Sequence, residues 1–72
     1  MSIDAQSQGT HVYVLTLQSE RGDVCTLSGT HTPRDGWTRY DLLVQLRADA
    51  SRRNPSMENG IVLFFLLEPN TL

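Results

Sequence analysis

Ile61-Val-Leu-Phe-Phe-Leu-Leu67 is an unbroken run of seven large apolar residues in a chain of 72. A strand with one wet face alternates polar and apolar residues, and this run does not, so both of its faces must be covered. A chain of this length buries only about 60% of its unfolded surface. The run therefore predicts that a partner surface covers part of this strand.

Two further segments, residues 11–18 and 23–31, alternate in the way that half-buried strands do. The link between them fits a three-residue hairpin loop, with Gly22 in the left-handed conformation that such a loop needs. This loop pairs Ser19 with Asp23 and gathers the apolar residues of both strands on one face. A shift by one residue would mix the two sets, so the pattern itself selects the register.

A helix is predicted over residues 39–53. Thr38 is a good N-cap, and Asp41 at the third helical position completes a capping box. Asn54-Pro55 ends the helix. At about 100° per residue the apolar stripe contains Leu42, Leu43, Leu46 and Ala50, and Tyr40 and Val44 extend it.

The elements run strand, strand, helix, strand, which predicts an α+β fold: a small ββαβ domain with one helix packed on one face of a three-stranded, mostly antiparallel sheet. We expect one domain over residues 11–68, a flexible lead-in over 1–10 and a tail over 69–72. Strand order 2-1-3 is expected, because a central first strand uses its apolar content best. The alternative places the third strand parallel to the second.

Because the helix shields only one face of the sheet, the other face keeps an exposed set of apolar side chains. Burying them at about 25 cal/mol per Å² is worth as much as the stability of a small domain. We therefore predict a non-enzymatic interaction module whose partner is a second copy, in a homodimer formed through that face or through edge pairing of the third strand, or else another protein. The predicted interface residues are Val12, Val14, Val62, Phe64, Leu66, Trp37 and Tyr40.

Two alternatives stay open for this interface. The partner-facing half of the third strand is either Val62, Phe64 and Leu66 or the half made of Ile61, Leu63, Phe65 and Leu67. The lead-in or the tail over residues 69–72 could also fold back over the face and replace the partner.

The arginine residues support a second, less favoured function. The net charge is −2 and all six basic residues are arginines. A small DNA-binding regulator would use the arginines of the helix and its preceding turn, which are Arg34, Arg39, Arg52 and Arg53. Asp41 and Asp49 on the exposed helix face and the negative net charge argue against this function, and Asp49 is expected to pair with Arg53.

No motif indicates catalysis. The chain has no nucleophile elbow, and its lack of lysine excludes a Walker-type phosphate loop. His11 and His31 should lie opposite each other in the hairpin, but no third ligand follows at a suitable spacing. We therefore expect no enzyme, no cofactor, no metal and no small-molecule substrate.

The remaining signals concern the compartment. Cys25 is the only cysteine, which excludes a disulfide within the chain and fits a reducing environment. The first nine residues are polar and lack the basic start of a signal peptide. The seven-residue apolar run falls far short of the ~20 residues that span a bilayer. We expect a cytoplasmic protein that does not bind membranes.

Overall fold

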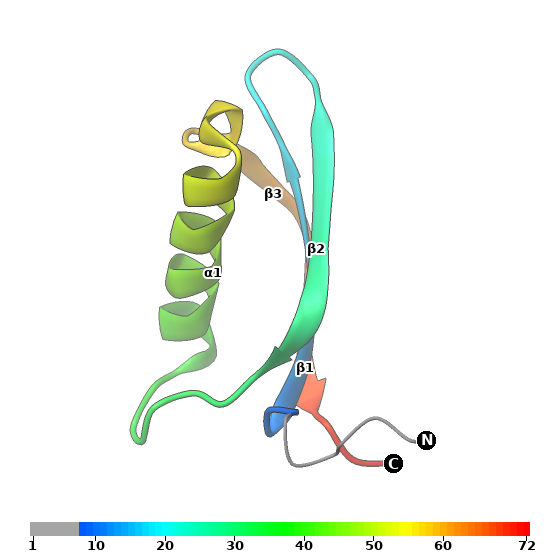
Figure 1. Ribbon diagram of the computed structural model, residues 1–72, viewed down its shortest axis with the longest axis vertical. Helices are drawn as coiled ribbons and strands as arrows, with labels where there is room; N and C mark the ends of the chain where they lie inside the picture. Colours follow the sequence, from blue (N-terminus) through cyan, green and yellow to red (C-terminus); the bar gives the residue numbers. More distant parts are fainter. Residues whose placement is uncertain (1–7) are drawn as a thin grey trace.

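The computed structural model describes residues 8–72. Its elements are β1 (His11–Gln18), β2 (Val24–His31), α1 (Arg39–Arg53), the short 3-10 helix η2 (Pro55–Met57) and β3 (Ile61–Pro69). The three strands form one antiparallel sheet in the order β2-β1-β3, and α1 lies along one side of it (Figure 1). The predicted α+β fold and strand order 2-1-3 are confirmed, and the parallel alternative is wrong.

The β1–β2 hairpin has the register that the sequence pattern selects. Leu15 lies opposite Leu27, and the backbone N–H of Ser19 donates to the carbonyl oxygen of Asp23 at 2.8 Å. Gly22 has a φ of 97°, in the left-handed region where a side chain would be strained. The loop chemistry and the apolar alternation therefore agree on one pairing.

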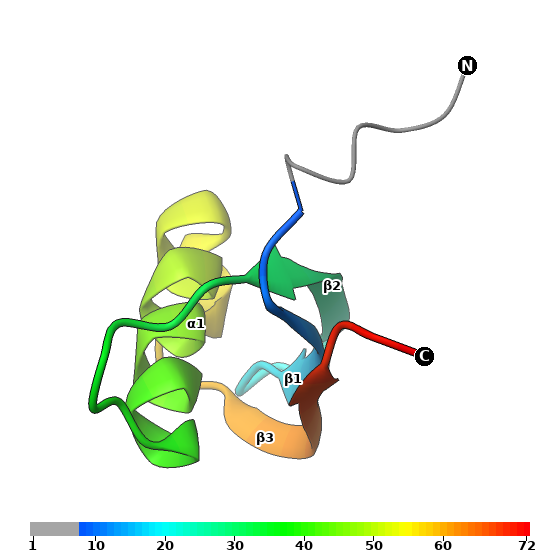
Figure 2. The same ribbon diagram turned by 90° about the horizontal axis from the view of Figure 1, so that it is seen from below.

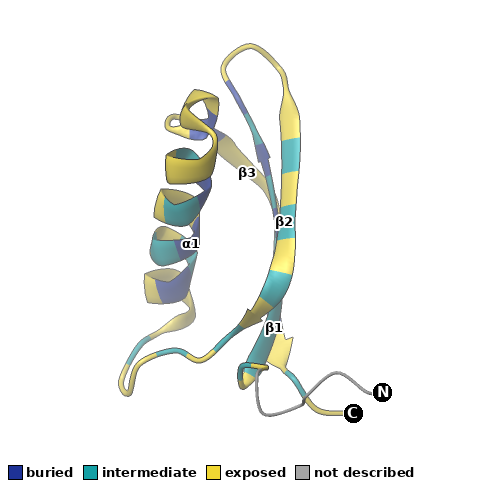
Figure 3. Ribbon diagram, viewed as in Figure 1, coloured by how far each residue is buried: buried dark blue, intermediate teal, exposed yellow. Residues whose placement is uncertain are grey.

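Helix α1 begins at a complete capping box. The Thr38 hydroxyl accepts from the Asp41 backbone N–H at 3.1 Å, and the Asp41 carboxylate accepts from the Thr38 N–H at 2.9 Å. The helix turns its buried residues toward the sheet (Figure 3), and these are Leu42, Leu46 and Ala50. Tyr40 and Val44 do not widen this stripe as predicted. They are 70% and 49% exposed, because their side of the helix faces away from the sheet.

One predicted charge pair is wrong. Asp49 pairs with Arg52, three residues on, and also accepts a hydrogen bond from Gln45 Nε2 at 3.1 Å. Both partners use the same carboxylate oxygen, Oδ1. The carboxylate is therefore held by Gln45 and Arg52 rather than by Arg53.

The core lies between α1 and the sheet, and it is closed at one end by η2. Its buried members are Leu15, Leu17, Leu42, Leu46, Ala50, Met57 and Leu67. Met57 comes from η2, which the sequence pattern did not reveal, because three residues are too few to show a period. Asn54 starts η2 by accepting from the Ser56 N–H at 3.3 Å.

Strand β3 contains a bulge that changes which of its side chains face the helix. Thr16 pairs with Phe64, but the next β1 residue, Leu17, pairs with Val62, so Leu63 is an extra residue in β3. Beyond the bulge, Phe65 lies opposite the core residue Leu15. The pleat therefore assigns Phe65 to the helix side and Phe64 to the opposite side.

Candidate functional site

The sheet face that points away from α1, here called the outer face, has two unlike halves. Residues that lie opposite each other in antiparallel strands project to the same face, so the register defines each half. The apolar half, on β1 and β3, consists of Val12, Val14, Ile61, Phe64 and Leu66. The hydroxyl half, on β2, consists of Thr26, Ser28 and Thr30, and the same face also carries the exposed Val24 of β2 and Thr16 and Gln18 of β1.

The apolar half is partly open to solvent in the single chain, and its Val12, Val14 and Leu66 are intermediate in exposure. Phe64 is 52% and Ile61 is 59% exposed. Figures 1 and 2 show α1 on one side of the sheet, and no other described helix or strand covers the opposite side. Neighbouring exposed apolar side chains on one face can mark an interaction surface. We therefore take the apolar half as the candidate functional site.

The C-terminal residues do not fold over the outer face. The backbone N–H of Asn70 donates to the Thr10 carbonyl oxygen at 2.8 Å and continues the β1–β3 ladder by one rung. Leu72 beyond it is fully exposed. The other alternative, cover by the lead-in, falls mainly on residues 1–7, which lie outside the described residues.

The predicted interface residues fall into three places. Val12, Val14, Phe64 and Leu66 are brought together on the outer face. Val62 is not among them, because the bulge places it opposite the core residue Leu17, on the helix side. Ile61 takes its place on the outer face opposite Gln18. Strict alternation along β3 could not show this exchange, since no glycine or turn residue marks the bulge.

The two predicted aromatic anchors, Trp37 and Tyr40, lie apart from the outer face. Trp37 packs against the core cluster, and the Arg34 guanidinium carbon lies 5.7 Å from its ring centroid. Tyr40 is exposed on the first turn of α1. Both residues belong to the helix layer, so they do not join the strand residues in one surface.

The four arginines of the DNA-binding alternative are divided between the two ends of α1. Arg34 and Arg39 lie at its start, and Arg52 and Arg53 lie about 20 Å away at its end, at 1.5 Å per residue. Three of them already have partners: Arg34 stacks on Trp37, Arg39 donates to the Leu67 carbonyl oxygen and Arg52 pairs with Asp49. The structure therefore does not gather them into one basic patch.

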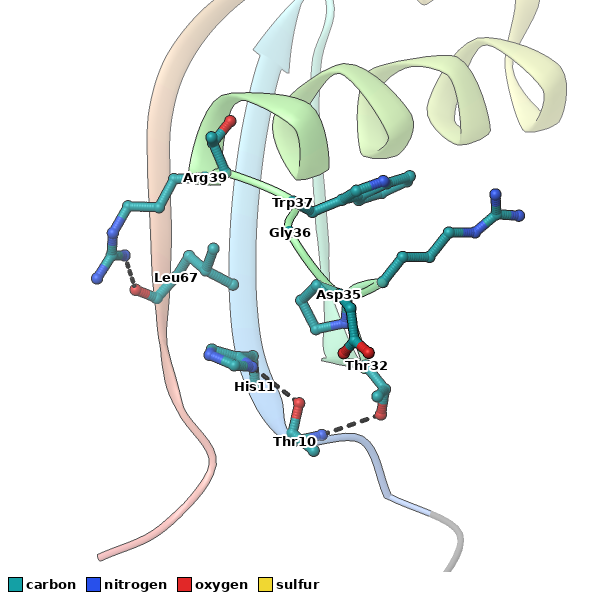
Figure 4. Close-up of a pocket in the computed structure, with 11 residues that line it drawn as sticks. Thr10, His11, Thr32, Asp35, Gly36, Trp37, Arg39 and Leu67 are labelled. Carbon is teal, nitrogen blue, oxygen red and sulfur yellow. Dashed lines mark hydrogen bonds between the residues drawn. The ribbon is translucent and has the colours of Figure 1, made fainter.

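A hollow of about 550 Å³ lies between the start of β1, the loop before α1 and the first turn of α1 (Figure 4). Some of its polar groups bond to one another: Thr10 Oγ1 is 2.8 Å from His11 Nδ1, and the Thr10 N–H donates to Thr32 Oγ1 at 3.2 Å. Figure 4 shows Arg39 reaching toward β3 and Trp37 directed to the other side. A ligand or catalytic site needs polar groups that converge, and these do not.

His11 and His31 lie opposite each other across the hairpin, as the register predicts. Among residues 8–72, no group of three or more His, Cys, Asp or Glu side chains is close enough to hold a metal ion. Cys25 is partly buried and packs against the core from β2. These side chains thus form no shared site within the described part of the chain.

The hydrogen-bonding pattern fixes which backbone groups of the two edge strands point away from the sheet. In antiparallel pairing, hydrogen-bonded pairs alternate with pairs whose N–H and C=O groups point outward. Ser19 and Asp23 form a hydrogen-bonded pair, as do Thr10 and Asn70. Counting along the register, the outward groups of β2 belong to Val24, Thr26, Ser28 and Thr30, and those of β3 beyond the bulge belong to Phe65, Leu67 and Pro69.

The outer edge of β3 is protected against further strands in three ways. Arg39 Nη1 donates to the outward carbonyl oxygen of Leu67. Pro69 has no N–H to offer, and the bulge at Val62 and Leu63 breaks the regular spacing of the edge. Edge strands in natural proteins are commonly protected by such charges, prolines and bulges. The β3 edge is therefore a poor template for a second chain.

Comparisons with models of known protein families, with curated proteins and with solved structures gave no match. Across the described residues, no helix combines the length and the apolar character needed to cross a membrane. The shape and chemistry of the outer face are therefore the basis for inferring a function.

Proposed function

We propose that this protein is a small non-enzymatic interaction module that self-associates by packing the outer faces of two copies against each other. The observation that carries the proposal is the exposed apolar half, which no described element covers. Transfer of apolar surface out of water stabilises an assembly by about 25 cal/mol per Å². A two-fold axis lets the same residues of both copies meet, which is the commonest form of self-association.

Charge supports a second copy as the occupant of this face. The apolar half contains no charged side chain, and Glu68, opposite Val12, lies at its end. Two copies related by a two-fold axis therefore bring no like charges together at the centre of the interface. Packing through the face is favoured over pairing through the β3 edge, because that edge is protected by Arg39, Pro69 and the bulge.

The proposed module would act in the cytoplasm. Cys25, the only cysteine of the sequence, is partly exposed and unpaired in the structure. Free thiols persist in reducing compartments, whereas oxidising ones favour disulfides. Mass spectrometry of the intact protein from its native source would detect a free thiol if this is correct, and an oxidised or cross-linked cysteine would contradict it.

The test is the solution mass of the chain, measured by light scattering across a range of concentrations, for wild type and three variants. Phe64→Asp places a charge in the apolar half and should reduce the mass at least twofold while the fold is kept. Val44→Asp is the matched control, because Val44 is 49% exposed on the helix side, and it should leave the mass unchanged. Phe65→Asp places a charge on the side of the sheet that faces the core, and this variant should unfold.

Two results would contradict the proposed function. One is a wild-type chain that stays at the mass of a single copy at high concentration. The other is an equal mass for Phe64→Asp and Val44→Asp, whether both lose mass or neither does, because that outcome would show no role specific to the outer face.

A further inference from the structure

The free edge of β2 differs from that of β3. Its outward N–H and C=O groups belong to Val24, Thr26, Ser28 and Thr30, and among the described residues none of these backbone groups has a hydrogen-bond partner. The strand Val24–His31 contains no proline, no Asp, Glu, Lys or Arg, and its register with β1 has no bulge. Within residues 8–72, therefore, none of the usual protections of an edge strand is present on this side of the sheet.

The described part of the lead-in crosses β2 only at its end. The N–H of Gly9 donates to the Thr30 hydroxyl at 2.9 Å. A Cβ atom on Gly9 would lie 2.5 Å from the His31 carbonyl carbon, so this close crossing requires glycine. Among the described residues, only β1 is hydrogen-bonded to the backbone from Val24 to Ser28.

The outward groups of β2 match a second copy of the same strand. A hydrogen-bonded antiparallel pair needs outward groups on both partners. When two copies of β2 run antiparallel with Leu27 opposite Leu27, position 24 lies opposite position 30 and position 26 lies opposite position 28. Each residue with outward groups then lies opposite another residue with outward groups. A second β2 in this register can therefore use every outward group between Val24 and Thr30, and the preference for this partner over another strand must come from the side chains.

The side chains suit the same pairing. On the helix side, Leu27 would meet Leu27 of the other copy, and Leu27 is only partly buried in the single chain. On the outer face, Thr26 would lie beside Ser28 of the other copy, which pairs hydroxyl with hydroxyl, as Thr16 and Thr26 do at 3.0 Å within the chain. Cross-strand pairs of these kinds are favourable.

We propose that β2 is a second self-association site, at which two copies join β2 to β2 antiparallel, with Leu27 at the two-fold axis. Two three-stranded sheets then become one sheet of six strands. The axis is perpendicular to the sheet, so both α1 helices stay on one side and both outer faces lie on the other. This pairing does not depend on the proposed function.

Together with face packing, the β2 pairing would give an assembly of four copies. Two continuous sheets would lie face to face and the helices would lie outside, which is a closed arrangement with three perpendicular two-fold axes. This larger assembly rests on the proposed function, whereas the pair of copies joined by β2 does not.

The first test uses Thr26→Pro, which removes an outward N–H that β1 does not use. Thr26→Ala is the matched comparison, since it keeps the N–H and loses only the hydroxyl that would lie beside Ser28, and it should lower the mass less than Thr26→Pro does. The wild type should have four times the mass of one chain, and Thr26→Pro should halve that mass, as should Phe64→Asp. The double variant should be a single chain. Unchanged mass for a folded Thr26→Pro would overturn the β2 pairing.

The mass series separates the two proposals. A loss of mass with Thr26→Pro but not with Phe64→Asp would remove the face packing and leave the β2 pairing in place. The reverse result would remove the β2 pairing alone. If Thr26→Ala lowered the mass as much as Thr26→Pro, the backbone N–H would not be the cause and the β2 pairing would be overturned.

A cross-linking test covers the case in which Thr26→Pro does not fold. Leu27→Cys is made in a Cys25→Ser background, so that the only thiol lies at the proposed axis, where Cα atoms about 4.5 Å apart allow a disulfide. Mild oxidation should convert most of the protein into a covalent pair. Val44→Cys in the same background should remain uncrosslinked. Failure of Leu27→Cys to cross-link, or equal cross-linking of the control, would overturn the pairing.

Discussion

Phe64 and Phe65 are neighbours in the chain and have different surroundings. Phe65 lies opposite Leu15 and packs against the core, whereas Phe64 is 52% exposed on the outer face. The pleat of β3 forces this division, because successive side chains of a strand project to opposite faces. A strand that is apolar at both positions therefore leaves one large side chain without cover whenever a single helix supplies the core.

The contrast between buried and exposed leucines gives a direct prediction. Leu15 is fully buried, so Leu15→Ala should lower the free energy of unfolding by about 3 kcal/mol, through lost burial and a cavity. Leu63→Ala is the control, because Leu63 is 50% exposed, and it should change stability by less than about 0.5 kcal/mol. Urea unfolding followed by circular dichroism measures both. Equal losses would show that the core is not where the structure places it.

The secondary-structure elements depend on local signals of different strength. Helix α1 keeps its predicted bounds, because Thr38 and Asp41 satisfy each other's backbone N–H groups at its start. The hairpin keeps its register, because Gly22 permits the loop and the apolar alternation allows only one pairing. Strand β3 has no such signal, since a uniformly apolar run fits several registers equally well.

The cap of α1 gives a second prediction. Thr38→Ala removes the hydroxyl that accepts from the Asp41 N–H, and it should cost about 1 kcal/mol of the free energy of unfolding. Ser51→Ala removes a hydroxyl from the last turns of the same helix and should be close to neutral, because alanine favours helix. Thermal unfolding of both variants tests this. A loss for Ser51→Ala as large as that for Thr38→Ala would contradict the role of the cap.

Much of the fold could be predicted from the sequence. The parts that could not be predicted are those that no local sequence signal marks. The β1–β2 register and the bounds of α1 follow from residues such as Gly22 and Thr38, whose chemistry favours one local conformation. The bulge that exchanges Val62 for Ile61 follows from packing between β1 and β3, and no single residue marks it. Met57 entered the core through a helix too short to show a period.

At the scale of the whole molecule, the sequence allowed us to predict that an exposed apolar face exists. It did not allow us to predict all of the residues that form this face. An apolar run without polar alternation indicates that two faces need cover, and in the structure α1 covers one face while no described helix or strand covers the other. The protected β3 edge and the unprotected β2 edge depend on Arg39, the bulge and the pairing pattern, which only the three-dimensional arrangement reveals. Cover of the apolar half by a second copy is the claim on which the proposed function depends.

That claim is tested by intermolecular nuclear Overhauser effects in a mixture of isotope-labelled and unlabelled chains. The Phe64 ring of one copy should show contacts to methyl groups of Val12, Val14 or Leu66 of another, and the Val44 methyl groups should show none. Absence of any contact between copies at the Phe64 ring, in a sample of high concentration, would contradict the account.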